Sequence, residues 1–192
     1  MKKSIFIIVL IWFISGCGTT LAPMQEYTLT TPTPPHNISK IHKSITIAMP
    51  RFLRNQNSRH IFYSYNQTKP NSYLNAQYSD MLSKVLYRSV YEYIDSAMVF
   101  DNVLDYSSDL GSDLRLKLLV YDISHHIQNN QSYAYMSIKA TLIDNQTAKI
   151  IKSKRFTYHI TAPTINASGY IQALNSANGR FMSDLLRFVS HN

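Results

Sequence analysis

Apolar positions at helical spacing mark two segments of this chain. In residues 73–93 and again in residues 168–189, apolar side chains recur three and four positions apart, with polar and charged residues between them. Because a helix brings such positions onto one face, both segments are predicted as amphipathic helices, the first beginning behind a turn at 69–72. Four residues on these apolar stripes are expected in the core: Leu82, Leu86, Phe181 and Leu185.

Alternation of apolar and polar residues, typical of half-buried strands, covers most of the remaining chain. Three long runs at 114–124, 132–143 and 150–160 are joined by short polar links, which predicts an antiparallel meander. Together with the two helices, this sheet predicts an α+β fold, a two-layer sandwich of an antiparallel-rich mixed sheet with two amphipathic helices. Shorter strands are predicted at 44–49, at 61–65 and around 99–100.

The first 16 residues follow a different pattern. Lys2 and Lys3 precede an unbroken apolar run at 5–14, and small residues then lead to Cys17, the only cysteine of the chain. A membrane-spanning helix needs about 17–25 apolar residues, so this run is too short for one. The layout is that of a secretory signal peptide. The alternatives are a short transmembrane anchor or a secreted protein with an unrelated cysteine.

The segment Ile14-Ser15-Gly16-Cys17 resembles the lipobox of bacterial lipoproteins. The resemblance implies cleavage before Cys17, transfer of diacylglycerol to its thiol and acylation, for example with palmitate, of the new amino group. Removal of residues 1–16 from 192 would leave 176 residues, with no free thiol for a disulfide. Gly18 is not the aspartate that retains enteric lipoproteins at the inner membrane. The outer membrane is therefore the expected location, with the chain facing the periplasm.

The composition indicates one folded domain behind an extended linker. Residues 17–40 begin with the lipidated cysteine and are rich in Thr and Pro, as in a tether, while 41–192 is predicted as a single α+β domain. The strand-like residues 27–29 are expected to pair with a sheet edge. The net charge of +8 is spread along the sequence without a Lys/Arg cluster. We interpret it as favouring solubility, with attraction to anionic head groups as a weaker effect and no nucleic-acid partner.

Residues able to carry chemistry are few. No glycine-rich phosphate loop and no G-x-S-x-G pattern occur, and there are only five glycines. His125 and His126 are adjacent in a predicted strand, so they point to opposite faces and cannot form one metal site with His159. We interpret all three as surface histidines near a hairpin end. No cofactor, metal or catalytic group is predicted, and the chain is not expected to be an enzyme.

Tyrosine is the main large amphipathic residue of the chain, with fourteen copies. Strands favour tyrosine, but Tyr87 and Tyr91 lie off the apolar stripe of the first predicted helix. Because tyrosine is enriched at interfaces, these two residues are candidates for a partner surface.

Short motifs over nearly the whole mature chain match one family. They are Cys17-Gly18-Thr19, Tyr27-Thr28-Leu29, the strand at 45–50, Ile61-Phe62-Tyr63, Leu114-Arg115-Leu116 and Ala173-Leu174-Asn175. On these residues the chain resembles the ABC-type transport auxiliary lipoproteins, the lipoprotein components of Mce-type lipid transport systems such as Pqi.

The resemblance implies a non-catalytic periplasmic subunit that helps lipid pass between the envelope membranes. Separate subunits would supply ATP hydrolysis, the membrane channel and the Mce domains. The implied partners are an Mce-domain protein, the ABC transporter subunits and the membrane through the lipid anchor, with a homo-oligomer as a further option. The alternatives are an outer-membrane assembly lipoprotein of the lipopolysaccharide-transport type and a cell-wall synthase activator lipoprotein.

Overall fold

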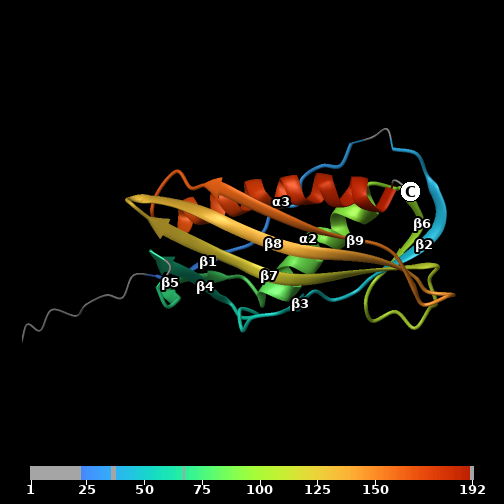
Figure 1. Cartoon of the computed structure of the whole chain (residues 1–192), viewed down its shortest axis with the longest axis horizontal. Helices are drawn as coiled ribbons and strands as arrows, with labels where there is room; N and C mark the ends of the chain where they lie inside the picture. Colours follow the sequence, from blue (N-terminus) through green and yellow to red (C-terminus); the bar gives the residue numbers. More distant parts are fainter. Residues whose placement is uncertain (1–22, 36–37, 67, 191–192) are drawn as a thin grey trace, which may run out of the picture.

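The computed structural model describes residues 23–35, 38–66 and 68–190. The predicted signal peptide and Cys17 lie outside these residues. Over the described ranges, none of the helices has the length and apolar character needed to cross a bilayer. Two helices pack against a mixed nine-stranded sheet (Figure 1), which confirms the predicted α+β class.

Strand β7 (Leu114–Gln128) organises the sheet. Along one edge it pairs in parallel with three strands in turn: β2 (Ile41–Ile47), β3 (Arg51–Phe52) and β4 (His60–Tyr65). Along its other edge it pairs with β8 (Gln131–Asp144), which pairs with β9 (Lys149–Thr161). Both of these pairings are antiparallel, so the predicted meander is confirmed. The remaining strands extend the sheet at β2 and β4, namely β6 (Phe100–Leu104), β5 (Asn71–Tyr78) and β1 (Gln25–Tyr27).

A bulge in β7 reverses the faces that its side chains occupy. The register with β8 shifts between Val120 and Asp122, leaving Tyr121 as the extra residue. Before the bulge, even-numbered residues such as Leu118 and Val120 are buried in the core. After it, the odd-numbered Ile123, His125 and Ile127 face the core.

The first predicted helix begins later than expected. Helix α2 spans Leu82–Ser96, and Asn71–Tyr78 forms strand β5 instead. Its apolar spacing was misleading, because Leu74 is 93% exposed and the buried residues of the strand, Ala76 and Tyr78, follow the period of two of a strand. Pairing with β4 and β1 supplies the backbone hydrogen bonds that a helix would otherwise make internally.

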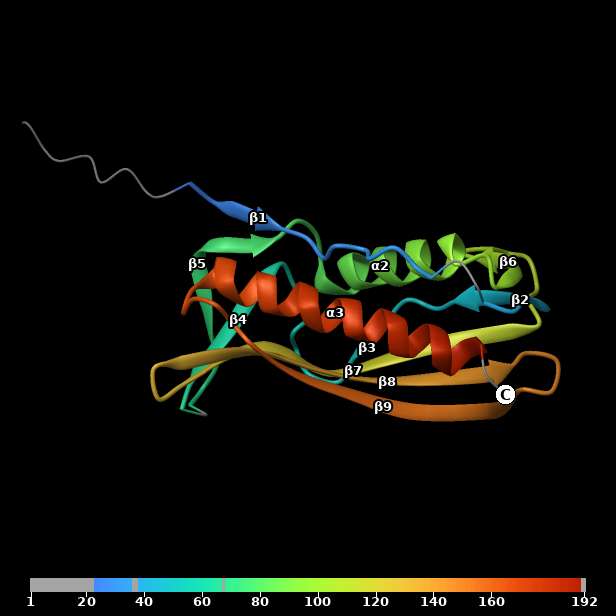
Figure 2. The same ribbon diagram turned by 90° about the horizontal axis from the view of Figure 1, so that it is seen from above.

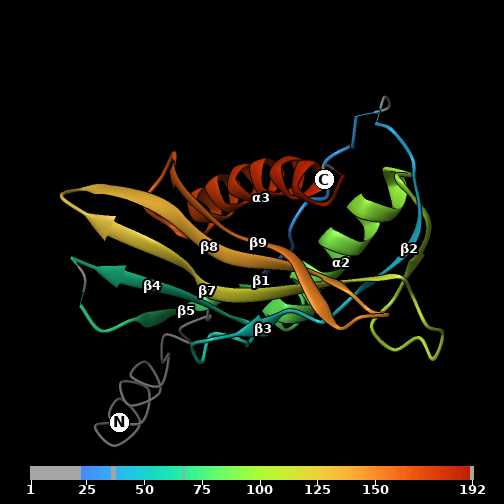
Figure 3. The ribbon, with the colours of Figure 1, turned by 45° about the vertical axis from the view of Figure 1, so that its right-hand side comes forward.

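Helix α3 (Ala167–Ser190) agrees with the second predicted helix and lies along β8 and β9, with α2 beside it (Figures 2 and 3). The apolar stripes of both helices face the sheet, and the predicted core residues Leu82, Leu86, Phe181 and Leu185 are each at most 1% exposed. No helix covers the opposite face of β7, β8 and β9 in the part of the chain that the structure describes (Figure 2).

Residues 25–30, which lie within the predicted tether of 17–40, are part of the folded domain. Strand β1 pairs with β5 at the sheet edge, as expected for this segment, and the chain behind it stays attached to the domain. Leu29 is buried, the Thr30 N–H donates to Asn175 Oδ1 at 3.0 Å, and Asn178 Nδ2 donates to the Thr30 carbonyl at 3.1 Å. Within the described residues, the sheet therefore starts with β1 at Gln25, and α3 provides specific partners for the backbone that follows this strand.

Candidate functional site

A polar cleft opens beside the second half of β7, where the β3–β4 loop and β4 meet this strand. Its volume is about 340 Å³. Residues from three parts of the chain line it: Arg54, Gln56, Phe62, Tyr63, Ser64, Thr68, Pro70, Asp122, Ser124 and His126.

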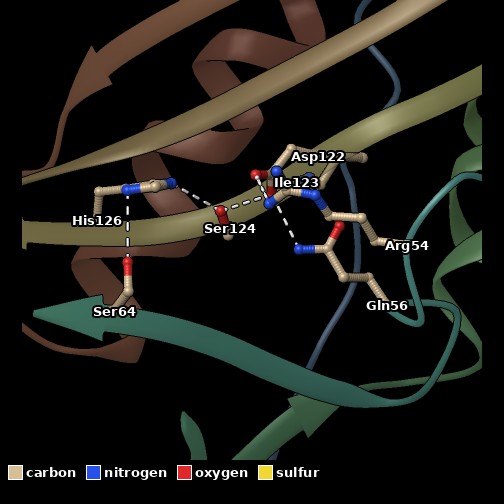
Figure 4. A network of polar contacts seen from close by, with 7 residues as sticks. All are labelled: Arg54, Gln56, Ser64, Asp122, Ile123, Ser124 and His126. Atoms are coloured by element: carbon tan, nitrogen blue, oxygen red, sulfur yellow. Dashed lines mark hydrogen bonds and ion pairs between the residues drawn. The ribbon is translucent and has the colours of Figure 1, made fainter. Parts of the chain in front are cut away.

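Asp122 is the centre of the hydrogen-bond network in this cleft (Figure 4). Its carboxylate is buried and accepts hydrogen bonds from Arg54 Nη1 at 2.9 Å, Gln56 Nε2 at 2.9 Å and Ser124 Oγ at 2.7 Å. The bulge in β7 creates this arrangement, because it turns Asp122, Ser124 and His126 away from the core and onto one face. A buried carboxylate with three donors is well satisfied and holds the β3–β4 loop against the sheet.

His126 takes part in this network as a hydrogen-bond donor. The Ser124 hydroxyl gives its proton to Asp122, so its oxygen accepts from His126 Nε2 at 2.9 Å. The other ring nitrogen, His126 Nδ1, lies 3.4 Å from Ser64 Oγ. Burial lowers the pKa of His126, although the Asp122 carboxylate acts in the opposite direction.

The order of these three residues differs from that of a nucleophilic triad. In a triad the histidine lies between the serine and the carboxylate and accepts the serine proton. Here Ser124 lies between Asp122 and His126, and its proton points to the carboxylate. His126 Nε2 carries a hydrogen in this arrangement and is not placed to act as a base toward Ser124.

The structure separates the three histidines of the sequence analysis. His126 and His159 share the uncovered face of the sheet, where each ring contacts both Tyr133 and Tyr135. His125 points into the core, so the interpretation of it as a surface residue is wrong. The bulge is the physical reason, since unbroken alternation would have turned His126 inward. Across the described ranges, no three His, Cys, Asp or Glu side chains are grouped closely enough to bind a metal.

His125 is fully buried between two tyrosine rings. Its imidazole stacks on Tyr170 at 5.0 Å and on Tyr73 at 6.1 Å, and its Nδ1 lies 2.8 Å from the Tyr73 hydroxyl. Its Nε2 is buried and has no hydrogen-bond partner among the residues that the structure describes. Burial, with a smaller contribution from His126, lowers the pKa of His125 to about 4.

This depressed pKa predicts an acid-sensitive domain. The unfolded chain binds a proton at His125 near pH 6.5, whereas the folded chain does so only near pH 4, so stability falls as the pH drops through this window. We expect His125→Phe, which keeps a ring between the two tyrosines, to remove up to about 3 kcal/mol of that loss. Urea unfolding at pH 7.5 and pH 4.5 measures the difference. An equal acid-induced loss in both proteins would contradict the role of His125.

The candidate partner residues Tyr87 and Tyr91 are half-buried and bonded within the chain. The Tyr87 hydroxyl accepts from the Tyr106 N–H at 3.2 Å, and the Tyr91 hydroxyl donates to the Val103 carbonyl at 3.2 Å. Both therefore attach the end of β6 and the following loop to α2. Contact with a partner stays a prediction, as does lipidation of Cys17, which is outside the described residues.

Sequence reasoning missed the Asp122 network. Its hydrogen bonds from Arg54, Gln56 and Ser64 to β7 each join residues more than 60 positions apart, and only the bulge and the parallel pairing of β4 with β7 bring them together. One signal was present, because Asp122, Ser124 and His126 form a polar series of period two in the second half of β7.

Comparisons with known proteins identify the fold. No protein-family model and no curated protein match the sequence. Among solved structures, a DUF330-family protein from Xanthomonas campestris is similar with a TM-score of 0.79 and 17% identity, covering 86% of this chain and 95% of that one. A second, uncharacterized protein has a TM-score of 0.67 and 13% identity over 88% and 100% of the two chains. The PelC dodecamer from Paraburkholderia phytofirmans has a TM-score of 0.51 and 8% identity over 84% and 95%. The chain thus has a fold found in these proteins.

Proposed function

We propose that this chain is a lipid-anchored, periplasm-facing lipoprotein that acts as a non-catalytic auxiliary subunit of an ABC/Mce-type lipid transport system. The observation that carries the proposal is the position of the lipobox-like Cys17 directly ahead of β1, a strand built into the sheet. A lipid on Cys17 would attach this α+β domain to a membrane through only a short linker.

The length of that linker limits where the domain can lie. Cys17 and Gln25 are eight residues apart, so an extended chain places β1 at most about 29 Å from the anchored cysteine. This distance suits a subunit that works next to the membrane that holds it.

The positions of the family-like motifs support the same proposal. Leu114-Arg115-Leu116 begins β7, and Ala173-Leu174-Asn175 lies on α3. Asn175 accepts the hydrogen bond from Thr30, which directly follows Tyr27-Thr28-Leu29. Two motifs that are distant in the sequence therefore lie side by side, and their hydrogen bond attaches the N-terminal segment of the domain to α3.

Two further features support a binding role. The Ser124 and His126 arrangement offers no activated nucleophile. PelC, which has a similar fold, forms a dodecamer in its solved structure, and a homo-oligomer of this chain is therefore part of the proposal.

The anchor is tested by intact-mass measurement of the full-length protein purified from membranes. We expect loss of residues 1–16 and the added mass of diacylglycerol and an acyl chain on Cys17. Cys17→Ala should keep the uncleaved N-terminus and lack the lipid. A wild-type protein that is water-soluble and unmodified at Cys17 would contradict the anchor.

A further inference from the structure

The uncovered face of the meander collects cations that are far apart in the sequence. In the strand register Arg51 is paired with Leu119, Leu119 with Lys139, and Lys139 with Arg155, so one row crosses β3, β7, β8 and β9. Two more cations precede Leu119 on β7 at alternate positions, and therefore on the same face. We call the five exposed side chains the basic face: Arg51, Arg115, Lys117, Lys139 and Arg155.

Ion pairs within the described residues do not neutralise the basic face. Within the described ranges, none of its five residues forms an ion pair. Lys139 and Arg155 lie directly opposite each other, and like charges in that position destabilise a sheet. The Arg155 guanidinium stacks on Tyr121, with Cζ 3.4 Å from the ring centroid, which fixes its direction without neutralising it. An anion bound between these side chains would remove the repulsion.

An exposed apolar side chain borders the basic face. Ile143 and Ile150 are paired across β8 and β9 beside Arg115; Ile150 is 65% exposed, whereas Ile143 is partly buried. A shallow hollow of about 560 Å³ at this position is lined by Gly111, Ser112, Arg115, Lys117, Ile143, Asn145, Gln146 and Ala148. Cations next to an exposed isoleucine form the combination that binds at a membrane interface, where phosphates meet the first acyl carbons.

We infer that the basic face binds the anionic phospholipid headgroups of a bilayer surface. The cations contact lipid phosphates, and Ile150 inserts at the level of the headgroups. Strand β1, which follows the short linker, belongs to the same sheet, so a lipid on Cys17 keeps this face close to a membrane and raises its effective concentration there. The binding itself depends neither on the lipid anchor nor on a transport partner.

Vesicle co-sedimentation of residues 23–192 tests this inference without the anchor. The buried core residues of the described ranges lie between Leu29 and Val189, so this fragment retains them, and cooperative thermal unfolding verifies its fold. We expect it to bind vesicles in which about one third of the phosphatidylcholine is replaced by phosphatidylglycerol, and not pure phosphatidylcholine vesicles. Binding should weaken as the salt concentration rises from about 0.05 M to about 0.5 M.

Matched variants separate the basic face from the overall charge. Lys139→Thr with Arg155→Thr removes two cations of the face, while Arg88→Gln with Arg180→Gln removes two exposed cations on α2 and α3. Since each cation near an anionic surface contributes about fivefold to partitioning, we expect roughly 25-fold weaker binding for the first variant. The second should stay within about twofold of the wild type.

Three outcomes would overturn the inference. The first is an equal loss of vesicle binding in the two variants. The second is equal binding of the wild-type fragment to both kinds of vesicle. The third is a wild-type fragment that does not bind vesicles but binds polyglutamate through the same residues. The last outcome would assign the face to an acidic protein. None of them bears on the transport role, because neither the anchor nor a transporter subunit is present.

Discussion

Replacement of Leu82 or Leu185 by alanine should lower the free energy of unfolding by about 2–5 kcal/mol each. Leu82 is 1% exposed on α2 and Leu185 is fully buried on α3, both in the common core between helices and sheet. Removing either side chain loses its transfer free energy and leaves a cavity that the sheet cannot close. Such a loss is a large fraction of the roughly 5–15 kcal/mol that stabilises a typical domain.

Leu74→Ala is the matched control for this measurement, because it removes the same atoms from a side chain that is 93% exposed. It should change the free energy of unfolding in urea by less than about 0.5 kcal/mol. A large loss from Leu74→Ala, or unchanged stability in the Leu82 or Leu185 variant, would contradict the positions of β5, α2 and α3.

Asp122→Ala should cost about 2–4 kcal/mol, the second largest effect expected. The substitution leaves the Gln56 amide and the Ser124 hydroxyl without their acceptor in a buried place and frees Arg54 at the edge of the cleft. We also expect the β3–β4 loop to exchange its amide hydrogens faster, because Asp122 holds that loop against the sheet.

Asp109→Ala provides the comparison, since Asp109 is exposed and carries the same charge. Its effect should stay within about 0.5 kcal/mol. Equal stability of the Asp122 and Asp109 variants in urea would show that the network in the cleft contributes nothing to folding.

Hydrophobic periodicity correctly predicted those helices and strands whose buried positions in the fold follow the apolar positions of their own sequence. The meander could be predicted because Ala134, Met136, Ile138 and other alternate residues face the core on one side. Helix α3 has a complete apolar stripe, and its bounds were predicted to within a residue. Strand β5 could not be recognised, because its local helical spacing is overridden by pairing with strands on both sides.

The candidate sites depend on register, which a single sequence does not reveal. One extra residue in β7 exchanged the faces of His125 and His126 and gave Asp122 its partners. The basic face shows the same limit. Its cations look scattered along the sequence, and only the pairing of Arg51, Lys139 and Arg155 across the sheet gathers them. Cys17 is the opposite case, because its candidacy rests entirely on contiguous residues.

Affinity purification of the full-length protein from detergent-solubilised envelopes tests the central claim most directly. We predict that the wild-type protein co-purifies with an Mce-domain protein and ABC transporter subunits. The Cys17→Ala variant, which is neither cleaved at the lipobox nor lipidated, should not co-purify with these proteins. A lipidated wild-type protein that instead co-purifies with a large outer-membrane β-barrel or a cell-wall synthase, and with no Mce-domain protein, would contradict the transport role.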